Sequence, residues 1–318
     1  MATGYYHQNL GDLKSRLKEA VPHEELKKLH VIQPGRHLLS AFRLFLSYGI
    51  ALGLLIQVEQ PIYWIPLAIW QGFTILGFII LLHELVHDLA FRKPRPRIQS
   101  LLATLYALPS GIAPSQFRRW HLDHHDELGS DSEDPKRAHL SPKSNQRWIK
   151  FLYFTPALFL IYARAAGRAA KGYTVELRRR IALERIMAVL VHGGLAYLLY
   201  QQGEGVLFRA WFCPLFLCFP PIFLLNRLGQ HYSIDPDDPA HWSTRVDGHW
   251  LWRWLFVNSN HHIEHHYYPK VPHYHLPALN RQLRPFFEEQ KIANNTYSGL
   301  IWNWFVRNKP PHSQWSSS

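Results

Sequence analysis

Long stretches without charge alternate with polar, basic stretches along this chain. The clearest apolar stretch runs from Pro61 to Leu82 and holds 22 residues with no charged side chain. At about 1.5 Å of rise per residue, a helix of this length crosses a hydrocarbon core of about 30 Å. Comparable apolar stretches predict spans at about 41–58, 181–200 and 206–225. The pattern therefore predicts an all-α integral membrane protein with four transmembrane helices.

Two further apolar stretches do not qualify as spans. The stretch 101–117 is interrupted by Pro109, Gly111 and Pro114, and the stretch 151–163 holds only 13 residues. Because exposed, broken backbone is not tolerated in a hydrocarbon core, we expect both to form interfacial helices at the membrane surface. Neither is expected to carry the chain across the membrane.

The fourth predicted span has unusual composition. Its three prolines, Pro214, Pro220 and Pro221, predict a kink or break. It also holds both cysteines of the chain, Cys213 and Cys218. On an α-helix, residues five apart do not share a face, so we expect no disulfide between them, and the composition fits a reducing compartment.

The ends of the chain differ from the spans. Residues 1–40 form a basic N-terminal segment, the predicted membrane domain covers 41–290, and residues 291–318 form a C-terminal tail. Four leucines of the N-terminal segment have the spacing of amphipathic helices: Leu13, Leu17, Leu26 and Leu29. We expect these helices to lie on the membrane, with a solvated leader as the alternative.

The positions of the charges predict the orientation. The chain has 35 Lys and Arg and a formal net charge of +12. The short turns at 59–60 and 201–205 contain neither Lys nor Arg, and only Arg43 and Arg209 lie near span ends, which leaves 33 of the 35 on the other side. By the positive-inside rule both termini face the cytoplasm. A membrane surface explains the charge, so we expect no nucleic-acid partner.

Histidine is concentrated in three clusters, which we call the histidine boxes. Their spacings are H-x-x-x-H once and H-x-x-H-H twice: His83 and His87; His121, His124 and His125; His262, His265 and His266. On a helix, residues at i, i+3 and i+4 point to one side, so the imidazoles of a box can converge on one point. All three boxes lie in segments predicted to face the cytoplasm.

The number of histidines constrains the chemistry. Eight or nine neutral imidazoles are too many for one ion but suffice for two metals with open positions, and imidazole suits iron as well as zinc. Acidic neighbours are candidates for hydrogen bonds to the ring N–H groups, although ordinary exposed carboxylates are the alternative: Glu84, Asp88, Asp123 and Glu264.

With the tail His261–Pro277, the three boxes resemble the membrane fatty-acid desaturase family of di-iron enzymes, over about residues 40–290. The resemblance implies a cytoplasmic helical cap in which the eight box histidines bind two irons (Fe²⁺/Fe³⁺). His231, after the fourth span, is similar to a further ligand in some members, and Asn226 and His261 are similar to residues behind the ligands. It also implies a membrane lipid or acyl substrate, dioxygen and a separate ferredoxin- or cytochrome-type electron donor.

Several alternatives remain open at this point. Lipid hydroxylation and carotenoid hydroxylation or ketolation use similar boxes, and the loop 128–135 after the second box is also similar to the family, though a turn there needs no function. His83-Glu84-Leu85-Val86-His87 is also a literal H-E-x-x-H, which predicts an intramembrane zinc metalloprotease with Glu84 as general base. A metal transporter is less favoured, because only His192 lies within a span.

Overall fold

The computed structural model describes residues 4–311, and within that range every regular element is a helix. One isolated bridge joins Arg245 and Asn294. The chain divides into two compact units, which we describe separately. Unit 1 contains the chain up to Ile32, Trp120–Leu152 and the chain from Leu224 onward; unit 2 contains Gln33–Arg119 and Tyr153–Phe223. The predicted all-α class is confirmed.

Four helical runs are long and apolar enough to cross a membrane, as predicted: α4 (Pro34–Gln57), α5 (Pro61–Val86), α10 (Val175–Tyr200) and Glu204–His231. The last run consists of α11 (Glu204–Leu207), the π-helix η4 (Phe208–Cys218) and α12 (Phe219–His231). Each run extends beyond the predicted apolar stretch at one or both ends, because backbone hydrogen bonding continues past the last apolar residue. Large side chains on α10, such as Val189 at 70% exposure, are left for lipid to cover.

The starts of these helices follow from local chemistry. Pro34 and Pro61 occupy the first turns of α4 and α5, where a missing N–H costs nothing. The Thr174 hydroxyl caps α10 by accepting from the Leu177 N–H, and Glu176 in the first turn complements the helix dipole.

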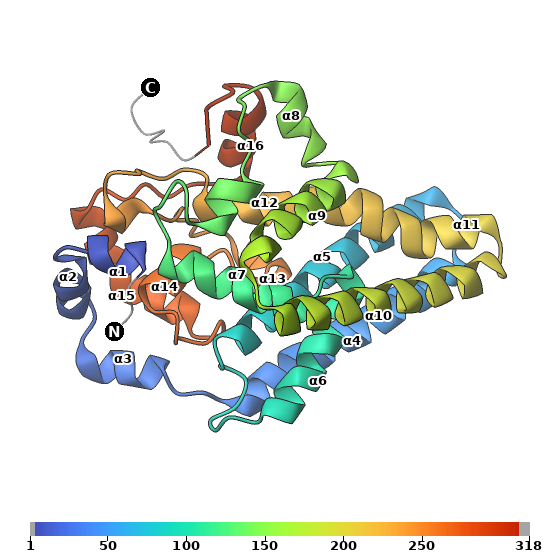
Figure 1. The fold of residues 1–318 in the computed structure, drawn as a ribbon, viewed down its shortest axis with the longest axis horizontal. Coiled ribbons are helices and arrows are strands. Elements are labelled where there is room, and N and C mark those ends of the chain that lie inside the picture. Colours follow the sequence, from blue (N-terminus) through green and yellow to red (C-terminus); the bar gives the residue numbers. More distant parts are fainter. Residues whose placement is uncertain (1–3, 312–318) are drawn as a thin grey trace. The chain divides into compact units, whose positions relative to one another are not determined.

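Within unit 2, α5 is the central helix (Figure 1). It packs against α4, α6 (Pro96–Ala107) and η4. Gly72 permits the close approach to η4 and α12, since a Cβ there would lie 2.9 Å from Ile222 Cδ1. The other helices of this unit are η1 (Leu108–Ser110), α9 (Ala157–Ala169) and η3 (Ala170–Gly172). Neither α6 nor α9 has the length and composition of a span, which agrees with the two stretches excluded from spanning.

The π-helix η4 overturns the expected placement of the two cysteines. The turn is wider in a π-helix, with hydrogen bonds from i to i+5, so residues five apart lie over one another. Cys213 Sγ and Cys218 Sγ are therefore only 3.8 Å apart, and both thiols are free. Pro214 lies inside η4, and its carbonyl accepts from the Phe219 N–H in the wide pattern. The fourth span widens at its first proline instead of breaking.

Unit 1 buries the leucines of the N-terminal segment. The helices α2 (Leu13–Ala20) and α3 (His23–Leu29) pack on the amphipathic helix α15 (Leu276–Glu289). Leu13, Leu17 and Leu29 belong to one core with Leu283 and Phe287. The predicted amphipathic helices are present, but their leucines pack on α15 instead of being left for a membrane to cover. Burial of such side chains is the main stabilising term of this core.

The remaining helices of unit 1 are short. They are α1 (Tyr5–Asn9), η2 (Lys136–Leu140), α8 (Arg147–Leu152), η5 (Pro239–His241), α13 (Trp250–Leu255), α14 (His262–Tyr267) and α16 (Tyr297–Phe305). The chain passes between the two units four times: after Ile32, inside α7 (Pro114–Asp126), after Leu152 and inside α12.

Candidate metal centre

The first histidine box lies at the end of α5 in unit 2. His83 occupies the last turn, and His87 is the C-cap residue. Asp88 follows with a left-handed φ of 60°, which ends the helix. The His83 and His87 rings are 4.9 Å apart between centroids, so the predicted i, i+4 pairing is present.

The second and third boxes lie in unit 1. Box two stands in the last turns of α7 and box three makes up most of α14, whose six residues are too few to be stable alone. Val257 and Asn258, just before box three, have left-handed φ values of 49° and 62°. For a β-branched residue such as Val257 this conformation is strained, and burial of the side chain holds it in place.

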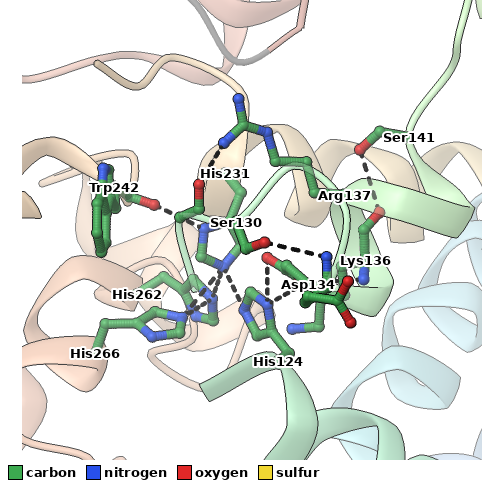
Figure 2. Close-up of polar contacts among 12 residues, drawn as sticks. His124, Ser130, Asp134, Lys136, Arg137, Ser141, His231, Trp242, His262 and His266 are labelled. Carbon is green, nitrogen blue, oxygen red and sulfur yellow. Dashed lines mark hydrogen bonds and ion pairs between the residues drawn. The ribbon is translucent and has the colours of Figure 1, made fainter. Parts of the chain in front are cut away.

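Three histidines of these two boxes and the last residue of α12 form one buried group, which we call the four-histidine group: His124, His262, His266 and His231. Their ligand atoms lie within 4.8 Å of one another. His231 Nε2 is the centre, at 2.9 Å from His124 Nε2, 2.9 Å from His262 Nε2 and 3.1 Å from His266 Nε2 (Figure 2). The structure thus brings together residues from α7, α12 and α14, and the group includes His231.

The tautomers of two rings show why hydrogen bonds cannot satisfy this group. His124 Nδ1 lies 2.9 Å from both carboxylate oxygens of Asp134, so it carries a proton and donates. His231 Nδ1 donates to the Trp242 carbonyl at 3.1 Å. Each Nε2 then has a lone pair directed at the group. The lone pair of His231 Nε2 could accept one N–H hydrogen bond, yet three other Nε2 atoms surround it. This arrangement of ligand atoms fits a bound cation.

A second set of histidines in unit 1 contains His121, His125 and His265. His265 Nε2 lies 3.0 Å from His125 Nε2, and the His121 and His125 rings are 4.6 Å apart. Their ligand atoms also lie within 4.8 Å of one another. Unit 1 by itself therefore presents two sets of imidazoles, one of four histidines and one of three.

Burial keeps the group neutral. The pKa of His266 is well below its usual value, first because of burial and then because of the neighbouring His262, His231, His124 and His265. Neutral imidazole is the form that binds a metal, since its free nitrogen retains the lone pair.

The sequence interpretation missed Asp134. Its side chain is 3% exposed, accepts from His124, and also accepts from the Lys136 backbone N–H at 2.9 Å. The loop that carries it begins at Gly129, with φ 93°, where a Cβ would lie 2.7 Å from the Trp242 ring. Asp134 falls in the loop 128–135, but the sequence does not show which of its three carboxylates points inward.

The predicted neighbours of the ligands have different surroundings. Glu264 is buried, accepts from the Asn280 amide and lies 3.4 Å from His261 Nδ1. Glu84 is buried 3.9 Å from His83 Nδ1. Asn226 accepts from the Ser259 hydroxyl, exposed Asp88 accepts from the Gln99 amide, and Asp123 is half-buried.

Fold and site together define a helical membrane protein in which buried imidazoles converge in a metal-binding geometry. The sequence matches the family described as fatty acid desaturase over residues 60–298, three quarters of the chain. The protein belongs to the fatty acid desaturase family and is an oxidoreductase.

The sequence identity to individual relatives is low. The chain is 25% identical over 238 residues to the sphingolipid delta(4)-desaturase/C4-monooxygenase of Homo sapiens, covering 70% of this chain and 66% of the relative. It is 24% identical over 280 residues to the chloroplastic omega-6 fatty acid desaturase of Brassica napus, covering 80% and 60%. It is 20% identical over 271 residues to the acyl-lipid (8-3)-desaturase of Rebecca salina, covering 70% and 60%. The chain thus spans about two thirds or less of the length of these relatives.

Proposed function

We propose that this protein introduces a double bond into the acyl chain of a membrane lipid, using dioxygen and electrons from a separate ferredoxin- or cytochrome-type carrier. The observation that supports this most directly is the convergence of three Nε2 atoms on His231 Nε2 in a buried site. The family supplies the reaction class, and the exposed apolar faces of the spans supply a route for a lipid substrate.

In this proposal the nine predicted histidines hold two irons. The four-histidine group holds one, and the set His121, His125 and His265 contributes to the other, for which box one is the proposed source of the remaining ligands, His83 and His87. Iron bound by imidazoles with open positions for dioxygen supplies an oxidant able to remove hydrogen from an unactivated CH₂.

The surrounding residues position the imidazoles. The Asp134 carboxylate and the Trp242 carbonyl hold His124 and His231 in the Nδ1–H tautomer, which directs both Nε2 lone pairs into the group. The burial of His262 and His266 excludes water from the ligand side. The pair Glu264 and Asn280 ties α14 to α15 and so fixes box three.

Lipid hydroxylation is the second candidate, because the human relative is named both a desaturase and a C4-monooxygenase. The protease alternative is dropped, since the H-E-x-x-H segment lies inside the region matched to the desaturase family. Analysis of lipids from cells with and without the gene distinguishes a new double bond from a new hydroxyl group.

Metal analysis of the purified full-length protein tests the proposal. We expect close to two irons per chain when iron is supplied during expression, and product formation that requires both dioxygen and a reductant. His231→Ala should lower the iron content and nearly abolish turnover. The matched control is His241→Ala, because His241 is half-buried in unit 1 and contacts the Gln290 carbonyl. A single zinc without activity after iron loading, or turnover under nitrogen, would overturn the proposal.

A further inference from the structure

Two short helices of unit 1, α8 and α16, are joined by basic side chains, and we call the pair the α8–α16 platform. Arg147 donates to the carbonyls of Phe305 at 2.9 Å and Val306 at 3.0 Å. Lys150 is fully buried and donates to the carbonyls of Trp304 at 3.2 Å and Lys309 at 2.8 Å. These donors satisfy the last carbonyls of α16 and complement its dipole, so they fix α16 on α8.

Four large apolar side chains of this platform are exposed. Trp148 and Phe151 on α8 are 63% and 58% exposed, and Trp302 and Val306 at the end of α16 are 54% and 49% exposed. The buried side of α16 is filled instead by Tyr297, Leu300 and Trp304. Large aromatic side chains are costly to leave in water, so a platform that presents them needs a partner.

The two sequence segments that carry the platform are basic, although Arg137 pairs with Asp131 just outside them. Residues 135–152 contain five Lys or Arg and no Asp or Glu, and residues 290–311 contain three and none. Arg307, next to Val306, is exposed. Tryptophan beside Lys and Arg is the composition of protein surfaces at the level of lipid headgroups, and each basic residue there is attracted by anionic lipid.

We propose that the α8–α16 platform binds the surface of a bilayer rich in anionic lipid, with Trp148, Phe151, Trp302 and Val306 inserted among the headgroups. The bilayer is the favoured occupant because the chain is anchored in it by four spans, so the local concentration of lipid is high at all times. An acidic carrier protein would match the charge but gives no reason for four exposed apolar side chains. The family match ends at residue 298, so most of α16 lies outside it.

Spin labels on the full-length protein in nanodiscs test this. Trp148→Cys and Trp302→Cys are labelled and compared with Lys18→Cys, an exposed position on α2. The signal of wild type treated with the same label corrects for Cys213 and Cys218. In discs with anionic lipid we expect the labels at 148 and 302 to collide several-fold more often with dioxygen, relative to a water-soluble nickel complex, than the label at 18. Arg307→Glu should reduce this preference in anionic but not in zwitterionic discs.

Three results would overturn the proposal. Equal access of the nickel complex to positions 148, 302 and 18 would show a water-exposed surface. Protection that depends on adding an acidic carrier would assign the platform to that protein, and protection that depends on protein concentration would assign it to a second copy. Because the tryptophans are exposed, their loss should not unfold the chain; Phe151→Cys and Val306→Cys repeat the measurement if either variant does.

Discussion

At the scale of single residues, Asp134 controls how one ring enters the four-histidine group. Its carboxylate forces the proton of His124 onto Nδ1, so the Nε2 lone pair stays available without a change of tautomer. Its own position is set by the Lys136 backbone N–H and by a loop that packs on Trp242. A negative charge on the far side of the imidazole also raises its strength as a ligand.

We therefore expect Asp134→Asn to lower the affinity for the metal by about 10–100-fold, the usual range for loss of such a partner. The measurement is iron retained per chain after dialysis against a graded chelator. Asp131→Asn is the matched control, because Asp131 lies on the same loop and its side chain, which pairs with Arg137, is 82% exposed. If Asp134→Asn retains iron like the wild type, packing alone orients His124.

At the scale of elements, Lys150 joins α8 to α16. Lys150→Met keeps most of the apolar stem but leaves two carbonyls of the α16 end without their donor. We expect a loss of about 1–3 kcal/mol of local stability, and faster cleavage in limited proteolysis near residue 297. Lys143→Met is the control, since Lys143 is exposed. Equal cleavage of both variants would show that packing on Trp304 is sufficient.

The same lysine gives a pH dependence. Burial, and then the nearby Arg147, lowers the pKa of Lys150 to about 8. Its unfolded pKa is about 10.4, so between these values the unfolded chain binds more protons and the folded state gains stability as pH rises. The stability of wild type relative to Lys150→Met should therefore increase from pH 7 to pH 10 in thermal unfolding. A constant or falling difference would contradict this.

The elements also show where a sequence is informative. Spans and box spacings follow from periodicity and charge, which act over a few residues. His231 was predicted from the family resemblance and not from a local pattern. The contact of Leu13 and Leu17 with α15, and the inward turn of Asp134, depend on residues far along the chain, so no local pattern encodes them. The prediction that Cys213 and Cys218 lie on different faces is wrong because the span is not α-helical throughout.

At the scale of the whole molecule, our proposal puts the segments before α4 and after α12 on one side of the membrane, because four spans are an even number. The distribution of Lys and Arg makes that side the cytoplasm in our proposal. A membrane-impermeant maleimide applied to intact cells should label Gln202→Cys, in the exposed turn after α10, but not Lys18→Cys. Wild type serves as the blank for Cys213 and Cys218. Labelling of Lys18→Cys instead would invert the proposed orientation.

The widened segment η4 also fixes the angular phase of everything that follows it in the fourth span. If deletion of Phe216 leaves the wide turns of η4 in place, the loss of one residue turns Asn226 and His231 by roughly a quarter of a turn about the helix axis. We expect this deletion to abolish iron binding, measured as iron per chain, whereas Phe216→Ala loses the same ring contacts but keeps the metal. Lipid accepts almost any apolar side chain at such positions, so substitutions there are tolerated. An insertion or deletion changes the direction in which every later side chain of the span points, so the number of residues is constrained.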